Sequence, residues 1–129
     1  MKLCIDTNIF RAISDQNQQV LELLSSATEI LLPFIVVAEL HAGFKNGNRF
    51  RENDLRLQSF IQKNGIQVLH STIETIDIYS DITTHLRKIG KPIPTNDIWI
   101  AALAMEYGSR LLTLDKHFDL ISGLRLVDV

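Results

Sequence analysis

The stretch MKLCIDTNIF, residues 1–10, contains the pattern that decides the fold. A short apolar run that favours a strand, residues 2–5, stops at the acid Asp6. Apolar residues then return with Ile9 and Phe10, which indicates a corner between a strand and a helix. At such a corner Asp6 can cap the helix or belong to an active site, and the rest of the chain has to distinguish these interpretations.

Short strand-like runs alternate with longer helical segments along the whole chain. This alternation is typical of an α/β protein whose mostly parallel sheet has helices on both faces. We therefore expect a three-layer α/β/α sandwich with a five-stranded sheet. The predicted strands cover residues 2–5, 30–32, 66–69, 111–114 and 124–127.

The composition is that of an ordinary globular protein. Hydrophobic residues make up 46% of the 129 residues and charged residues 22%, which predicts one domain, 1–129. The net charge of −2 argues against nucleic-acid binding through bulk positive charge, so such binding would need local patches. We expect no leader sequence and no membrane-spanning stretch, and the single cysteine, Cys4, fits a reducing compartment. The cytoplasm is therefore the expected location.

Two helices have recognisable starting points. The sequence STIE at residues 71–74 is typical of a capping box. The helix that follows is expected to expose Asp77 and Asp81 and to bury a face made by Ile73, Ile76, Tyr79, Ile82 and Leu86.

The segment NDIWIAALAMEYG, residues 96–108, is apolar almost all round and predicts a central buried helix. Thr95 or Asn96 can cap this helix. Asp97 falls in its first turn, where the helix dipole favours a negative charge, so a purely structural role already explains this acid.

Four acids nevertheless interrupt apolar sequence at comparable places. Asp6 and Asp115 end predicted strands. Glu39 lies about one turn into the helix after the second strand, and Asp97 heads the buried helix. In an open parallel sheet, strand carboxyl ends and helix amino ends lie on the side where ligands bind. The four acids are therefore expected to converge on one cleft.

Carboxylates that converge repel one another and raise one another's pKa, and a hard divalent cation relieves this repulsion. Oxygen ligands suit Mg²⁺ or Mn²⁺, whereas no cysteine and histidine spacing typical of zinc is present. His117 lies close to Asp115, but all the histidines are expected to be structural or surface residues: His41, His70, His85 and His117.

A divalent ion bound by carboxylates points to phosphate chemistry. Such an ion lowers the pKa of a bound water and polarises a phosphoryl oxygen. The chain has neither a P-loop nor a GxGxxG motif, so the use of a nucleoside triphosphate is not supported. A phosphodiester or a phosphomonoester is the expected substrate.

Four motifs in this chain resemble those of the PIN domain, and within that family those of the VapC-type ribonuclease toxins. They occur in the family's order and spacing and nearly span the chain: IDTN at 5–8, VVAELHAG at 36–43, IPTNDIWIAALA at 93–104 and LLTLDKHFDLI at 111–121. The resemblance implies a PIN-like sandwich in which Asp6 and Asp97 are the principal metal ligands. It also implies that Glu39 and Asp115 hold metal-bound waters or a second ion, with support from Thr7, Asn8 and Thr95.

The resemblance further implies Mg²⁺- or Mn²⁺-dependent cleavage of RNA, a homodimer and an antitoxin protein that blocks the site. A basic cluster lies in and around FKNGNRFREND, residues 44–54. It can hold an RNA backbone, contact the antitoxin or simply be solvated, and it consists of Lys45, Arg49, Arg51 and Arg56.

Other functions fit the sequence less well. A receiver domain needs paired acids after the first strand and a lysine after a late strand, where this chain has Asp115. A phosphatase of the haloacid-dehalogenase type needs a second acid two residues after Asp6, and residue 8 is asparagine. A non-catalytic PIN-like interaction module need not keep four acids. We therefore favour a ribonuclease.

Overall fold

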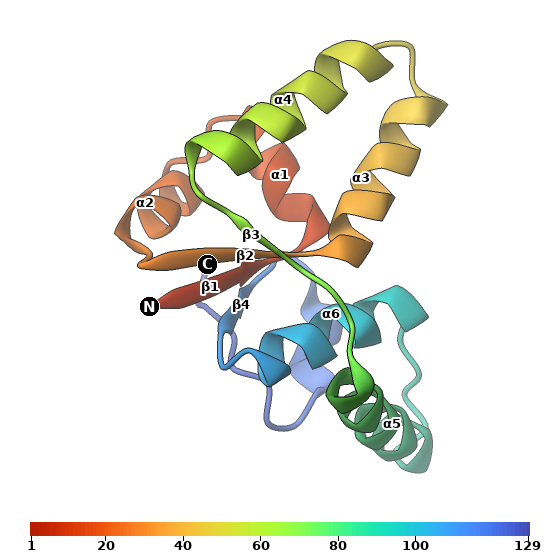
Figure 1. The fold of residues 1–129 in the computed structure, drawn as a ribbon. Helices are drawn as coiled ribbons and strands as arrows, with labels where there is room; N and C mark the ends of the chain where they lie inside the picture. The colour runs from red at the N-terminus through yellow and green to blue at the C-terminus, as the bar shows by residue number, and fades with distance from the viewer.

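The computed structural model describes residues 1–129 as a parallel sheet with helices on both faces (Figure 1). All strand pairs are parallel, and the strand order is β3-β2-β1-β4. The strands are β1 (Lys2–Ile5), β2 (Glu29–Pro33), β3 (Gln67–Leu69) and β4 (Arg110–Leu112). The predicted α/β sandwich with a parallel sheet is therefore confirmed.

The prediction of a fifth strand is wrong. Residues 124–127 contribute one isolated parallel bridge, between Leu126 and Leu111 of β4. Around it, the Leu111 N–H donates to the Arg125 carbonyl at 2.8 Å, and the Val127 N–H donates to the Leu111 carbonyl at 3.0 Å. Both hydrogen bonds involve Leu111 alone, so the alternating sequence of residues 124–127 meets β4 at one position and forms no ladder.

Six α-helices and one 3-10 helix connect the strands. Helices α1 to α4 lie on one face of the sheet, and α5 and α6 lie on the other (Figure 1). None of these helices combines the length and the hydrophobicity that a membrane span requires. The helices are α1 (Thr7–Ser14), α2 (Gln18–Ser26), α3 (Phe34–Asn46), α4 (Phe50–Lys63), α5 (Ile73–Lys88), α6 (Thr95–Glu106) and the 3-10 helix η1 (Lys116–Leu120).

The strand order positions a crevice at the carboxyl ends of β1 and β4. From β1 the chain moves outward to β2 and β3, then crosses back through α5 and α6 and adds β4 on the other side of β1. The segments after β1 and β4 leave the sheet toward different faces, since α1 packs against α3 and η1 packs against α6. In open α/β sheets ligands bind at such a switch point.

Helix α6 is the buried helix that the sequence predicts, with Ile98 and Ile100 among its buried residues. Its start differs from the prediction, because the N-cap position is Pro94 and no side chain caps the helix. Thr95 and Asn96 therefore lie inside the first turn, one and two residues after the cap.

Helix α5 begins one residue later than predicted, with Thr72 as its N-cap and Thr75 as the partner in the capping box. Thr75 is fully buried, and its hydroxyl donates to Glu106 of α6. Ile73 and Ile76, expected on the buried face, are 81% and 53% exposed. The buried residues of α5 are instead Thr75, Ile82 and Leu86.

Candidate active site

Asp6 lies between β1 and α1 and is only 4% exposed. Its Oδ1 accepts the Thr7 N–H at 2.7 Å, so Asp6 itself is the N-cap of α1. Its Oδ2 accepts the Thr113 hydroxyl at 2.7 Å and lies 3.4 Å from the Asn8 amide nitrogen. Oδ1 therefore caps the helix, and Oδ2 faces the loop that follows β4.

Two side chains join the ends of β1 and β4. The Asn8 Oδ1 accepts the N–H of Leu114 at 3.2 Å, and the Thr113 hydroxyl accepts the N–H of Asp115 at 3.0 Å. Thr113 therefore contacts two of the four acids, although the sequence reasoning did not single it out. The available signal was modest, since Thr113 is the first polar residue after the apolar run of β4.

Glu39 projects from α3 and is partly buried. The Thr7 hydroxyl donates to its Oε1 at 2.6 Å, and the Asn96 amide nitrogen lies 3.5 Å from its Oε2. Glu39 thus connects the corner after β1 with the first turn of α6. Asn96, considered only as a cap, makes this contact, whereas the neighbouring Thr95 is exposed and makes no side-chain hydrogen bond to the acids.

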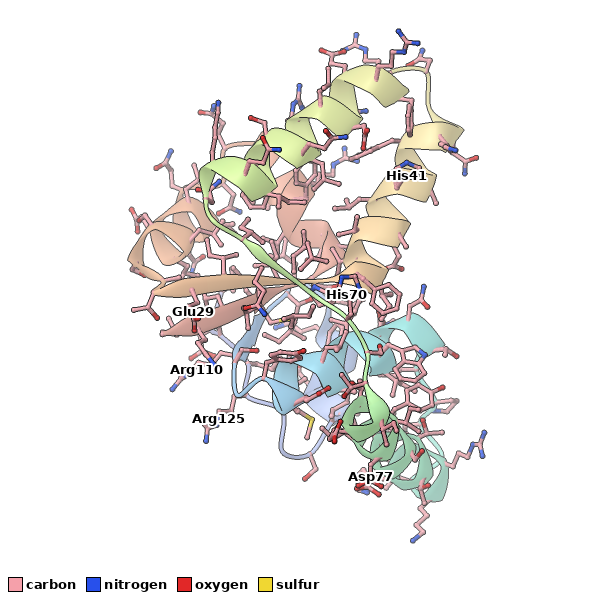
Figure 2. The ribbon with its side chains drawn as sticks, in the orientation of Figure 1. Glu29, His41, His70, Asp77, Arg110 and Arg125 are labelled. Atoms are coloured by element: carbon pink, nitrogen blue, oxygen red, sulfur yellow. The ribbon has the colours of Figure 1, made fainter.

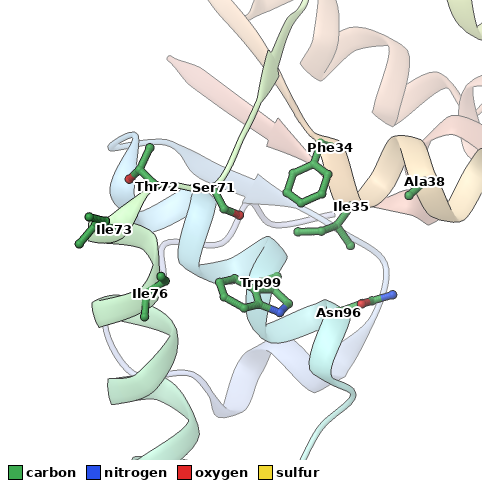
Figure 3. A pocket seen from close by; sticks show the side chains of 9 residues that line it. All are labelled: Phe34, Ile35, Ala38, Ser71, Thr72, Ile73, Ile76, Asn96 and Trp99. Carbon is green, nitrogen blue, oxygen red and sulfur yellow. The ribbon is translucent and has the colours of Figure 1, made fainter.

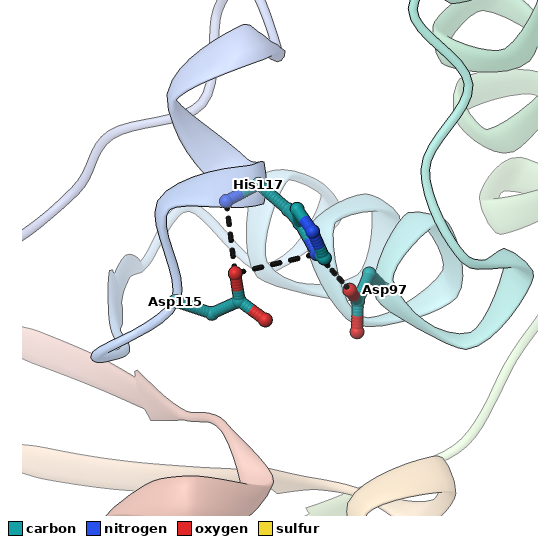
Figure 4. Close-up of side chains that lie close together, drawn as sticks. All are labelled: Asp97, Asp115 and His117. Carbon is teal, nitrogen blue, oxygen red and sulfur yellow. Dashed lines mark hydrogen bonds and ion pairs between the residues drawn. The ribbon is translucent and has the colours of Figure 1, made fainter.

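Asp97, Asp115 and His117 point toward one another, as Figure 4 shows. The His117 Nδ1 lies 3.4 Å from Asp97 Oδ2 and 3.3 Å from Asp115 Oδ1. Asp115 follows the end of β4 by three residues, and it caps η1 by accepting the His117 N–H at 2.9 Å. His117, expected to be a structural or surface residue, therefore lies directly among the acids.

The four acids are close enough to affect one another's protonation. Burial raises the pKa of Asp6, and the negative charges of Asp97 and Glu39 raise it further. Burial also raises the pKa of Asp97, and the charges of Asp115 and Glu39 add to this effect. The crevice therefore concentrates negative charge.

Three residues that the sequence places outside the site do lie elsewhere. Asp77 is exposed on α5, away from the crevice (Figure 2). The ring of His41 meets the Phe50 ring edge-on, with 5.0 Å between centroids. The ring of His70 stacks on Phe34 at 5.8 Å. These two histidines have aromatic neighbours rather than acidic ones.

A groove of about 500 Å³ runs from the acids along α1, α3 and α4. Glu39 lines it, and among the four predicted basic residues only Arg56 does so. Arg11 of α1 also lines this groove, although the sequence reasoning did not single it out. The basic residues outside the groove are Lys45, Arg49 and Arg51.

A second groove, of about 740 Å³, is mostly apolar and adjoins the acids through Asn96. Figure 3 shows Phe34 and Trp99 facing it from α3 and α6. Ile73 and Ile76 line the same groove from α5, and both are exposed. A contiguous exposed apolar surface of this kind is typical of a protein–protein contact.

The fold and the site together define an α/β protein with carboxylates gathered at the switch point of a parallel sheet. The family model described as PIN domain matches residues 3–124. The chain therefore belongs to the PIN domain family, which confirms the resemblance seen in its motifs.

Similar proteins cover nearly the whole chain. Ribonuclease VapC1 of Rickettsia felis is 32% identical over 132 residues, spanning 100% of this chain and 97% of that protein. Ribonuclease VapC2 of the same organism is 30% identical over 127 residues, spanning 95% and 93%. A chain in the crystal structure of VapBC2 from Rickettsia felis, bound to a promoter DNA fragment, superposes with a TM-score of 0.88 at 28% identity, covering 100% of this chain and 99% of that one.

Proposed function

We propose that this protein is a divalent-metal-dependent endoribonuclease that acts as the toxin of a toxin–antitoxin pair. The observation that carries the proposal is the gathering of four acids at the switch point: Asp6, Glu39, Asp97 and Asp115. Relatives named ribonucleases, similar over nearly the whole chain, support RNA as the substrate. RNA is abundant in the cytoplasm, which is the proposed place of action.

The donor set fits Mg²⁺ or Mn²⁺, because it consists mainly of carboxylate oxygens whose repulsion a hard cation relieves. Asp6 and Asp97, both with raised pKa values, are the proposed principal ligands. Glu39 and Asp115 are proposed to hold the ion's water shell or a second ion. When bound, the metal would polarise a phosphoryl oxygen and make a water molecule more acidic.

The neighbouring polar side chains hold these acids in place. The Thr7 N–H and the Thr113 hydroxyl donate to the two oxygens of Asp6, and the Thr7 hydroxyl donates to Glu39. Hydrogen bonds to an ionised carboxylate favour that form and oppose the effect of burial. Loss of such supporting partners typically costs 10–100-fold in metal affinity or activity.

We propose that Arg56 and Arg11 bind phosphates of an RNA strand that lies in the groove leading to Glu39. The remaining basic residues are proposed to contact RNA or the antitoxin outside the groove: Lys45, Arg49 and Arg51. Similarity to a chain of the VapBC2 structure supports an antitoxin partner.

We also propose a homodimer that uses the apolar groove between α3, α5 and α6. Ile73 and Ile76 are exposed there, beside Phe34 and Trp99. Burying these side chains against a second copy would remove them from water, which is the main favourable term in stable association.

The nuclease proposal is tested by neutralising the principal acids. Asp6→Asn and Asp97→Asn should each lower Mn²⁺-dependent RNA cleavage by about a hundredfold or more, measured on a labelled single-stranded RNA. Expression of the wild type should arrest bacterial growth, and expression of Asp6→Asn should not.

Asp77→Asn is the matched control, because it makes the same charge change at an exposed position on α5 and should cleave like the wild type. Full activity of either active-site variant would refute the mechanism. Wild-type activity that persists in excess chelator would refute the metal dependence.

A further inference from the structure

We propose that His117 is itself a ligand of the divalent ion and that its nitrogen makes the site prefer Mn²⁺ to Mg²⁺. This inference rests on the proposed metal-dependent nuclease function, and it adds a nitrogen donor to the set of acids. The structural basis is the position of the imidazole, which faces one carboxylate from its own loop and another from α6 (Figure 4).

The spacing of the donor atoms suits a shared ion. The His117 Nδ1 is 3.4 Å from Asp97 Oδ2 and 3.3 Å from Asp115 Oδ1. One donor atom from each of the three residues lies within 4.8 Å of the other two. Adjacent corners of an octahedron with metal–ligand bonds of about 2.1 Å are about 3 Å apart. The two distances from the imidazole nitrogen are therefore close to the spacing of neighbouring ligands around one ion.

The backbone holds His117 at this position. Its N–H donates to Asp115 at 2.9 Å, and the Asp115 N–H donates to the Thr113 hydroxyl at 3.0 Å. That hydroxyl donates in turn to Asp6, so a single side chain ties the His117 loop to the buried acid. Phe118, the next residue, is fully buried and anchors η1. The ring therefore projects from the anchored 3-10 helix η1.

A purely structural role does not account for where the ring points. The N–H of His117 already satisfies the cap of η1, and this bond does not require the imidazole. The ring instead reaches Asp97, which belongs to a different element and lies twenty residues earlier in the chain.

A nitrogen donor changes which ion the site prefers. Mg²⁺ is a hard cation that favours oxygen ligands and keeps several waters. Imidazole binds first-row transition ions better than it binds Mg²⁺. Within that series, Mn²⁺ is the ion that most resembles Mg²⁺ in binding carboxylate ligands. The combination of acids with His117 should therefore bind Mn²⁺ more tightly than Mg²⁺, and removal of the ring should reduce that difference.

The test is pulsed EPR spectroscopy of Mn²⁺ bound to the full chain. The wild type should show coupling between Mn²⁺ and a nitrogen nucleus, and the coupling should change when histidine is labelled with ¹⁵N. His117→Ala should abolish the coupling. It should also raise the Kd for Mn²⁺ by about tenfold or more and the Kd for Mg²⁺ by less than about threefold.

His85→Ala is the matched control, because it removes an exposed imidazole on α5 and should leave the coupling and both Kd values unchanged. His117→Gln provides a second variant that keeps a polar side chain, and it should lose the coupling as well. Metal-free thermal unfolding of both His117 variants should match that of the wild type, which shows that the loop still folds.

Two results would overturn the proposal. One of them leaves the proposed nuclease site in place, and the other rejects the metal site as well. Mn²⁺ that binds in an Asp6-dependent manner without nitrogen coupling would reject His117 as a ligand and leave the nuclease site in place. Mn²⁺ binding that neither Asp6→Asn nor Asp97→Asn weakens would reject the proposed metal site, and the assignment of His117 with it.

Discussion

Asp6 combines two roles that the sequence presents as alternatives. Its Oδ1 caps α1 through the Thr7 N–H, and its Oδ2 meets Thr113 across the crevice. A cap needs one carboxylate oxygen at a helix end, and exposed asparagine or serine fulfils this task equally well. Burial of a charged cap beside other acids raises its pKa and costs free energy. Capping therefore explains where Asp6 lies, but not why a buried carboxylate occupies the position.

Neutralising Asp6 should stabilise the metal-free protein at neutral pH. Because the folded-state pKa of Asp6 is raised above its ordinary value of 3.8, the folded state keeps this proton at pH values where the unfolded chain has lost it. The wild type therefore loses stability as the pH rises through that window. Asp6→Asn avoids this loss and still caps α1, so its Tm at pH 7 should be higher by a few degrees, on the order of 2–4 °C.

Thermal unfolding in chelator, followed by circular dichroism between pH 4 and pH 8, measures this effect. The gap between variant and wild type should narrow as the pH falls toward the ordinary carboxylic range. Asp77→Asn, at an exposed position, should show no comparable gap. A large loss of stability in Asp6→Asn at pH 7 would instead show that the charge of Asp6 serves the cap.

The acids could be found from the sequence, whereas several of their partners could not. An acid that ends an apolar run, such as Asp6, can be recognised from the neighbouring residues in the sequence. Thr113 reaches Asp6 across 107 positions of sequence, and nothing local in LLTLD marks its hydroxyl as a partner. Asn96 and His117 are similar cases, because their significance lies in contacts with Glu39 and Asp97 that only the fold creates.

Among the elements, α5 differs most from the prediction. Ile73 and Ile76 follow helical spacing, yet they are exposed, and the buried face begins at Thr75. Hydrophobic periodicity identifies a face that avoids water, but it does not say whether the same chain or another one covers that face. The buried contact between Thr75 and Glu106 of α6 fixes the orientation of the helix instead.

Removal of the Thr75 hydroxyl should weaken the packing of α5 on α6. The hydroxyl accepts the Thr72 N–H at 2.8 Å and donates to Glu106, so Thr75→Ala removes both hydrogen bonds. Glu106 keeps only the Thr72 hydroxyl, at 2.9 Å. We expect the free energy of unfolding to fall by about 1–3 kcal/mol, measured by urea denaturation.

Thr84→Ala is the comparison for this change, because Thr84 is exposed on the same helix. Alanine is the better helix former, so this variant should be as stable as the wild type or slightly more stable. Equal stability of the two variants would mean that the Thr75 network contributes nothing to the packing of α5 on α6.

For the whole molecule, strand order is what brings the site together. The alternation of strands and helices predicts a parallel sheet, but not that the chain returns across the sheet to place β4 beside β1. Because β4 lies beside β1, the corner after β1 is next to the loop after β4. The first turn of α6 places Asp97 at the same edge of the sheet. The closing segment is the counterexample, since its strand-like pattern forms only one bridge, between Leu126 and Leu111 of β4.

The apolar groove gives the prediction that belongs to the whole molecule. If a second copy covers it, the native mass should be twice the 14.6 kDa of one chain, measured by light scattering after size-exclusion chromatography. The double variant Ile73→Glu with Ile76→Glu should elute as a monomer, because burying two carboxylates in an apolar contact costs more than the contact supplies. Leu55→Glu places one such carboxylate at a 65% exposed leucine of α4 outside the groove and should leave the dimer intact. If the double variant is still a dimer, another surface joins the two copies. If the wild type is a monomer at micromolar concentration, the groove does not bind a second copy, and a different protein is the remaining partner for it.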